Sequence, residues 1–187
     1  MSTMSDDLQL DHALILHDDI ATAVAGLERL GFRPTPPGYH GEMLGTENVT
    51  VMLPDKRTYF EVLVVRDPTP VNAGQRSAFE ARGRHLFGAA LKGDARALSA
   101  RLGPAGISEG VPFDFQRAVE LPGGPADAAF TVAPFRADAL PGLTSFICQH
   151  HTPDVVWRAD YLNHANGAQA LTGLWGVAAD LDAVVRA

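Results

Sequence analysis

The sequence predicts an α+β protein in which one order of elements, a strand, a helix and three further strands, occurs twice. Each helical pattern is followed by several strand patterns in succession, which is typical of α+β rather than doubly wound α/β proteins. Two expected helix caps, Asp19 and Asp94, lie 75 residues apart, and so do Phe32 and Ile107, where extended chain resumes. This common offset indicates an internal repeat. The 187 residues, 46% of them hydrophobic, fit one compact globular domain or two tightly paired small modules.

The first module is predicted over residues 9–66 and begins with an apolar strand pattern at 10–16. A helix follows over 20–30, with Asp18 or Asp19 as its cap. Its three further strands are expected at 41–45, 48–53 and 58–65.

Residues 67–83 contain two prolines, glycine and two arginines, and predict a linker with one short helix. The second module is predicted over 84–151, with a strand at 85–91 and a helix at 95–102. Its remaining strands are expected at 113–121, 128–135 and 143–150.

The last part of the chain, 152–187, is predicted to be an extension of the second module. It contains a strand-like run at 170–178 and a short helix from Asp180 to Arg186. The strand could add to the sheet, pair with another chain or begin an incomplete further unit.

The composition excludes several classes of function. A net charge of −7 argues against a general nucleic-acid binder, and no apolar run approaches the ~20 residues of a membrane span. The N-terminus lacks the pattern of a signal peptide, so we expect a cytoplasmic protein. The single cysteine, Cys148, excludes an internal disulfide and a cysteine-rich zinc site. Any metal would therefore be held by His, Asp, Glu or Gln, which suit Fe, Mn, Ni, Co or Zn.

His12 is the residue of the first strand that most needs an explanation. An ionisable side chain is rarely buried without a partner. A core histidine hydrogen-bonded to a neighbour is one explanation, and a metal ligand or acid–base group is the other. Glu61 raises the same question in the strand at 58–65, where it could face solvent, form a salt bridge or bind a cation.

Five short motifs resemble the glyoxalase-like branch of the vicinal oxygen chelate superfamily, which includes glyoxalase I, extradiol dioxygenases and the bleomycin- and fosfomycin-resistance proteins. The motifs are Leu10-Asp11-His12, residues 39–48 (YHGEMLGTEN), residues 59–63 (YFEVL), residues 149–153 (QHHTP) and residues 164–168 (HANGA). The resemblance covers residues 9–178. It implies that the two modules pair into a curved mixed sheet around a central cleft, with metal ligands on the first and fourth strand of each module.

Carried onto this sequence, the resemblance implies that His12, Glu61 and His85 bind a divalent metal. The register of the helix caps instead places Phe87 opposite His12, two residues beyond His85 and on the same face of the strand. The last strand lacks the superfamily's frequent glutamate and offers Gln149, or His150 on the opposite face, in its place. Two histidines and one carboxylate would suit non-haem Fe(II) or Mn(II) and oxygen chemistry.

Further polar residues are candidates for the substrate pocket. Glu61 and His40 are the candidate catalytic residues, and a turn or surface role is the alternative for His40. The predicted substrate-binding residues are His40, Asn48, Arg117, Gln149 and His151. Arg117 suits a carboxylate or phosphate, although it could also face solvent. We expect His164 and Asn166 to hydrogen-bond their own loop.

Two classes of function follow from these expectations. The first is a divalent-metal-dependent enzyme that acts on a small oxygen-bearing organic substrate, of the lyase, isomerase or dioxygenase type. The alternative is a metal-free protein that binds or sequesters a small molecule, as the resistance proteins do. A third interpretation is that the protein has retained the fold but lost the activity, and that its C-terminal extension serves self-association. The resemblance also implies a homodimer.

Overall fold

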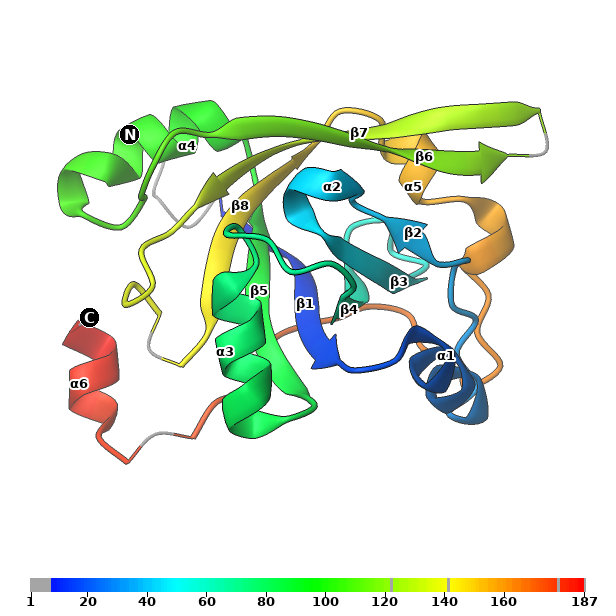
Figure 1. Cartoon of the computed structure of the whole chain (residues 1–187), viewed down its shortest axis with the longest axis horizontal. Coiled ribbons are helices and arrows are strands. Elements are labelled where there is room, and N and C mark those ends of the chain that lie inside the picture. The colour runs from blue at the N-terminus through cyan, green and yellow to red at the C-terminus, as the bar shows by residue number, and fades with distance from the viewer. Residues whose placement is uncertain (1–7, 122, 141, 178, 187) are drawn as a thin grey trace.

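One mixed sheet of eight strands organises the computed structural model, which describes residues 8–121, 123–140, 142–177 and 179–186. The strand order is β2-β3-β4-β1-β5-β8-β7-β6. The sheet curves until its two ends, β2 and β6, contact each other. Figure 1 shows the long β6–β7 hairpin crossing above β2 and β3.

The sheet has two halves with a similar order of elements. The first comprises β1 (Gln9–His17), α1 (Ile20–Arg29), β2 (Gly38–Tyr39), α2 (Gly41–Leu44), β3 (Thr46–Met52) and β4 (Tyr59–Val65). The second, which α3 (Ala73–Arg82) precedes, comprises β5 (His85–Lys92), α4 (Ala95–Leu102), a 3₁₀ turn (Gly103–Ala105), β6 (Phe113–Leu121), β7 (Gly124–Pro134) and β8 (Thr144–His150). The C-terminal extension contains α5 (Pro153–Val156), a 3₁₀ turn (Ala159–Tyr161) and α6 (Leu181–Arg186).

The modules join through their first strands. β1 pairs parallel with β4 in its own module and antiparallel with β5, which in turn pairs parallel with β8. Asp19 and Asp94 cap α1 and α4 through hydrogen bonds from the backbone amides of Thr22 and Ala97. The predicted α+β fold with a repeated order of elements is therefore confirmed.

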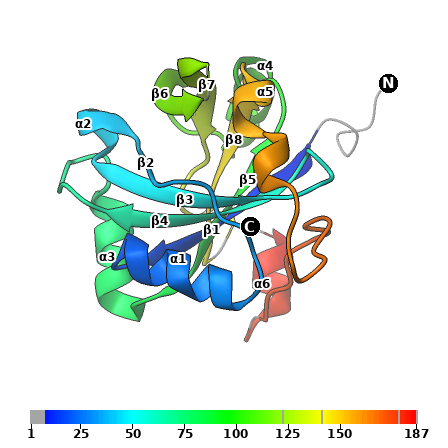
Figure 2. The same ribbon diagram turned by 90° about the vertical axis from the view of Figure 1, so that its right-hand side faces the viewer.

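The two module helices cover the outer face of the sheet. Ala23 of α1 packs against Val49 and Val62, and Leu98 of α4 packs against Ala133 and Ile147. Figure 2 shows α1 below β3 and β4, on the side away from β6 and β7.

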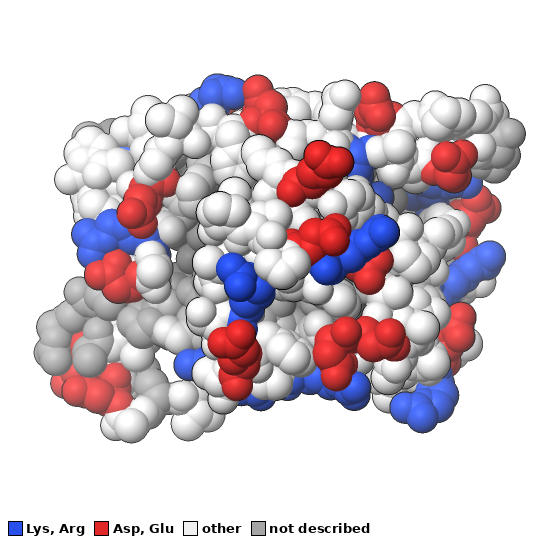
Figure 3. Space-filling view, viewed as in Figure 1, with Lys and Arg blue, Asp and Glu red and all other residues white. Residues whose placement is uncertain are grey.

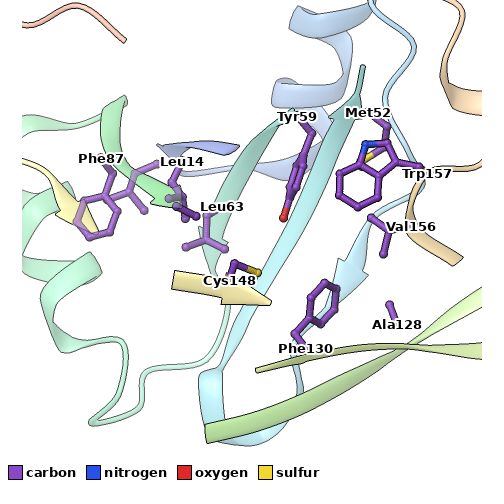
Figure 4. Close-up of a cluster of buried hydrophobic side chains, with 12 residues drawn as sticks. Leu14, Met52, Tyr59, Leu63, Phe87, Ala128, Phe130, Cys148, Val156 and Trp157 are labelled. Carbon is purple, nitrogen blue, oxygen red and sulfur yellow. The ribbon is translucent and has the colours of Figure 1, made fainter. Parts of the chain in front are cut away.

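The inner face of the sheet carries the main hydrophobic cluster. Figure 4 shows side chains of β1, β3, β4, β5, β7 and β8 converging there with Trp157, which follows α5. Tyr59 and Trp157 pack edge to face with ring centroids 5.8 Å apart. Because these residues lie on the concave face of the curved sheet, they also form the walls of any cavity inside it.

Two strand predictions were wrong. Residues 41–44 form the short helix α2, because Gly41 and Gly45 adopt positive φ angles of 83° and 61° that turn the chain at both ends. The first pairing residues of this region are instead Gly38 and Tyr39. In the extension, residues 170–177 form no strand, and residue 178 lies outside the described residues. The helix predicted after Asp180 is present as α6.

Two further observations concern the charged surface and the length of the helices. Figure 3 shows acidic and basic side chains interspersed over the viewed face, without an extended basic patch there. Among the described residues, no helix is both long and apolar enough to cross a bilayer.

Replacing Gly45 by alanine is expected to destabilise the fold by about 2–4 kcal/mol. The residue has φ +61°, and a Cβ there would lie 2.2 Å from the carbonyl oxygen of Asp67. The control is Gly26→Ala in α1, where a Cβ meets no atom within 4 Å and the better helix propensity of alanine should raise stability. Urea unfolding measures both changes, and equal effects of the two substitutions would contradict this account of α2.

Candidate functional site

The curved sheet encloses a cavity of about 350 Å³. Its walls are mostly apolar and aromatic, and the side chains come from both modules. Polar side chains interrupt these walls, and among them one group combines ionisable and amide side chains: His12, His40, Asn48, Glu61 and Arg117. An apolar pocket with a few convergent polar groups is the usual form of a small-molecule site.

His12 and Glu61 meet at the wall of this cavity. The pairing of β1 with β5 shifts register between Leu10 and His12, and this irregularity leaves Asp11 and His12 both buried. His12 Nδ1 donates to Asp11 Oδ2 at 2.7 Å, and His12 Nε2 lies 3.3 Å from Glu61 Oε2. The first-module pair implied by the resemblance is thus brought into contact.

The second oxygen of Glu61 faces β3 and α2. Asn48 Nδ2 donates to Glu61 Oε1 at 2.7 Å, because Asn48 and Glu61 are diagonal neighbours on paired strands. His40, which precedes α2, places Nε2 3.6 Å from the same oxygen. Its Nδ1 is fixed 2.9 Å from the Thr46 hydroxyl. Two histidines therefore direct Nε2 toward the two oxygens of one carboxylate.

The electrostatics of this cluster separate the two histidines. Burial alone would lower the pKa of His12, but its hydrogen bond to Asp11 and its contact with the Glu61 carboxylate raise it to about 9. Burial alone would raise the pKa of Glu61, but the contacts with His12, His40 and Asn48 lower it to about 2. Burial lowers the pKa of His40. The carboxylate is therefore ionised and His40 is neutral at ordinary pH.

The contact between His12 and Glu61 requires a positive charge. If His12 were neutral with its proton on Nδ1, the lone pair of Nε2 would point at an ionised carboxylate. His12 Nε2 is buried and has no hydrogen-bond partner. Either a second proton on the imidazole or a cation between the two groups removes the repulsion.

Asp11 connects this cluster to a second group of buried side chains. Lys92 Nζ lies 3.0 Å from Asp11 Oδ1, and His150 Nε2 donates to Asp11 Oδ2 at 2.9 Å. Burial opposes ionisation of Asp11, but the hydrogen bonds from His12 and His150 outweigh it and hold its pKa well below the usual range. Asp11, Cys148 and His150 bring three donor atoms within 4.8 Å of one another, yet the Lys92 ammonium opposes a further cation there.

The structure does not bring His85 to the cavity. Ala90, not His85, lies opposite His12, and His85 pairs with Leu16 further along β1. Its Nδ1 donates to the carbonyl oxygen of Gly83 at 2.8 Å, and it is not among the cavity-lining residues. The register of β1 and β5, which two irregularities shift, decides this placement.

Two of the predicted substrate-binding residues also lie elsewhere. Gln149 is on the outer face of β8, where its Oε1 accepts a hydrogen bond from Ala95 N at the start of α4. His151 is exposed and lies 2.7 Å from the Thr131 hydroxyl. The alternation of β8 puts His150 on the inner side instead. His40, Asn48 and Arg117 line the cavity, and their role in substrate binding stays a prediction.

The strand residues opposite His12 in the second module carry no metal donors. On β5, Ala90 lies opposite His12 and Gly88 lies opposite Leu14. On β8, Phe146 lies opposite Ala90. An alanine, a glycine and a phenylalanine cannot bind a metal through their side chains.

The motif at 164–168 anchors the extension to the first module. His164 accepts from the backbone amide of Arg33 through Nδ1 at 3.1 Å and donates to the Met52 carbonyl through Nε2 at 3.0 Å. Asn166 Nδ2 donates to the Leu30 carbonyl, and Gly167 N donates to the His164 carbonyl. The loop therefore bonds to itself, as expected, but also to α1 and β3, which the sequence did not indicate.

Comparison with known proteins gives the family. Residues 10–187 match the family model described as a glyoxalase-like domain. No curated protein matches the chain. Methylmalonyl-CoA epimerase from Mycobacterium tuberculosis superposes with a TM-score of 0.58 and 17% identity, over 75% of this chain and 86% of that one.

Two further solved structures have the same fold. A methylmalonyl-CoA epimerase in complex with methylmalonyl-CoA and NH₄⁺ gives a TM-score of 0.58 and 14% identity, over 78% of this chain and 96% of that one. A hypothetical protein from Bacillus halodurans gives a TM-score of 0.57 and 14% identity, over 76% of this chain and 94% of that one. At such identities these structures establish the fold alone. The family match, which spans almost the whole chain, shows that the protein belongs to the glyoxalase-like domain family.

Proposed function

We propose that the protein is a divalent-metal-dependent enzyme whose metal is held by His12, His40 and Glu61. The observation that carries this proposal is the convergence of two histidine Nε2 atoms on the two oxygens of one carboxylate, at 3.3 and 3.6 Å. In each histidine Nδ1 is already engaged, by Asp11 or by Thr46. Metal-binding histidines are commonly oriented in this way through the other ring nitrogen.

The donor set fits a metal although it differs from the one that the resemblance implies. Donors about 2.1 Å from one ion lie roughly 3.0–3.4 Å apart for bond angles between roughly 90° and 110°. The two contacts of Glu61 are close to this range. The ion would also supply the positive charge that the His12–Glu61 contact requires. In this proposal His40 replaces His85 as the third donor, and the second module contributes cavity walls instead of ligands.

The reaction that these residues best support is a proton shift next to a carbonyl group, as in an isomerase. When bound, the ion would polarise two adjacent oxygens of the substrate as a Lewis acid. Glu61 is the only carboxylate among the described residues that line the cavity, so we assign it the proton transfer. Asn48 holds one of its oxygens in place. The aromatic walls limit the access of water. The fold of the methylmalonyl-CoA epimerases is consistent with this class of reaction.

The expected result is metal-dependent exchange of a substrate proton with solvent. Pyruvate, phenylpyruvate and methylmalonyl-CoA serve as probes in deuterated water, and proton NMR follows the loss of the signal next to the carbonyl group. At least one probe should exchange faster with enzyme loaded with Mn²⁺, Zn²⁺, Ni²⁺ or Co²⁺ than with chelator-treated enzyme. Exchange that a chelator leaves unchanged, or that never exceeds the rate in buffer, would count against an isomerase-type reaction.

A second candidate reaction is ring-cleaving dioxygenation. Two histidines and one carboxylate with open positions are the usual ligands of non-haem Fe(II) oxygenases, and the cavity is lined by aromatic residues. Oxygen uptake with catechol by Fe(II)-loaded protein, without proton exchange in the other assay, would favour this reaction over the isomerase.

A further inference from the structure

Arg117 is placed to reach the cavity from the edge of the second module. Phe113, Phe115, Arg117 and Val119 alternate with exposed residues along β6 and face inward. The guanidinium extends across to β2, where a Cβ on Gly38 would lie 2.7 Å from Arg117 Nη1. A Cβ there would also lie 3.0 Å from Asn48 Oδ1, so the glycine leaves room for the guanidinium beside the polar cluster.

Among the residues that the structure describes, this arginine has no carboxylate within ion-pair distance. Several other arginines form ion pairs with carboxylates at the surface, namely Arg84, Arg96, Arg136 and Arg158. Among the described residues, Arg117 has neither an ion pair within 4 Å nor a side-chain hydrogen bond, although it is half-buried. Burial lowers the pKa of Arg117, and the attraction of the Glu61 carboxylate offsets this only in part. Partial burial of a guanidinium in a cavity wall costs free energy unless a bound ligand supplies a hydrogen-bonding anion.

We propose that Arg117 binds the carboxylate of the substrate, and that the substrate class is a small monocarboxylic acid with an apolar body. The inference deepens the proposed function because it concerns the same cavity. The planar guanidinium matches a carboxylate in a bidentate arrangement. Among the described residues that line the cavity, Arg117 is the only arginine and there is no lysine, so one guanidinium is available for one carboxylate.

The shape of the cavity supports an apolar body. Phe113, Phe115, Phe130 and Phe146 line it together with aliphatic side chains. Its volume of about 350 Å³ lies at the lower end of the range for ligand pockets, which is roughly 300–1,000 Å³. An aryl or branched alkyl acid therefore fits these walls, with its charged end at Arg117.

The test compares carboxylates with neutral amides of the same shape. Phenylacetate and phenylacetamide form one pair, and isovalerate and isovaleramide the other, with dissociation constants from isothermal titration calorimetry. Wild type should bind at least one acid about tenfold or more tightly than its amide, as expected for a charge-assisted hydrogen bond. Arg117→Gln should abolish this preference, and Arg117→Lys should retain only part of it.

Two further variants separate the local effect from charge and from folding. Arg29→Gln removes an exposed cation from α1 and should leave the preference unchanged. Gly38→Ala retains every charge but places a methyl group against the guanidinium, so it should also reduce the preference. Thermal unfolding of each variant shows whether it is folded.

The titrations are made on chelator-treated and on Mn²⁺-loaded protein, so that this inference and the proposed function can fail separately. A preference that depends on Arg117 in chelator-treated protein supports the inference whether or not metal binds. The inference is overturned if neither acid binds wild type more tightly than its amide, or if the preference survives in Arg117→Gln. It is also overturned if the preference for the acid occurs only in metal-loaded protein and is the same in Arg117→Gln as in wild type.

Discussion

Replacing Glu61 by glutamine is expected to lower the affinity for a divalent ion by more than about 100-fold, because losing even an outer partner of a ligand costs 10–100-fold. Glutamine keeps the shape of the side chain and can still accept the hydrogen bond from Asn48. It removes the negative charge between His12 and His40. Competition titrations of Zn²⁺ and Mn²⁺ against a chromophoric chelator measure the change.

The matched control for Glu61→Gln is His85→Ala. The resemblance makes His85 a ligand, but the structure places it outside the cavity with its Nδ1 on the Gly83 carbonyl. We therefore expect His85→Ala to bind metal as wild type does, and His40→Ala to bind it more weakly. The ligand set would have to be revised if His85→Ala lost metal while His40→Ala retained it.

Replacing Asp11 by alanine is expected to cost about 3–5 kcal/mol of folding free energy, the usual effect of removing one partner from a buried charge network. Asp11 is fully buried and contacts Lys92, His12 and His150. Its loss leaves the Lys92 ammonium beside Trp157 without a carboxylate, and His12 Nδ1 without an acceptor. Urea unfolding in the presence of a chelator measures this cost without a contribution from metal binding.

A surface aspartate provides the comparison for Asp11. Asp138 pairs with Arg136, and both side chains are largely exposed. Exposed ion pairs contribute little, so Asp138→Ala should change stability far less than Asp11→Ala. Similar losses in the two variants would show that the network around Asp11 does not stabilise the fold.

The helices and strands that the sequence predicted well are determined by residues close to them in the chain. The caps Asp19 and Asp94 and the apolar strand patterns depend on neighbouring residues, so the helices and most strands were predictable. The region at 41–45 was not, because two glycines with positive φ convert a strand-like pattern into a helical turn. The run at 170–177 has strand composition but finds no partner strand.

The site was predictable where one strand pair decides it. His12 and Glu61 lie on adjacent parallel strands of one module, and they do meet. The position of the third donor depends on the register between the two modules. The pairing of β1 with β5 changes register at two places, and the sequence does not reveal these changes. Asp11 belongs to one of the motifs that carry the family resemblance, but its role depends on Lys92 and His150 from other strands. The homodimer and the residue ranges of the modules stay predictions.

The measurement that tests the central claim most directly is elemental analysis of the protein purified without an affinity tag, beside His12→Ala and His85→Ala. We predict about one equivalent of Fe, Mn, Ni, Co or Zn in wild type and in His85→Ala, and none in His12→Ala. Wild type that binds no metal even after reconstitution with each ion would contradict the metalloenzyme, and the cavity would then be that of a metal-free binding protein.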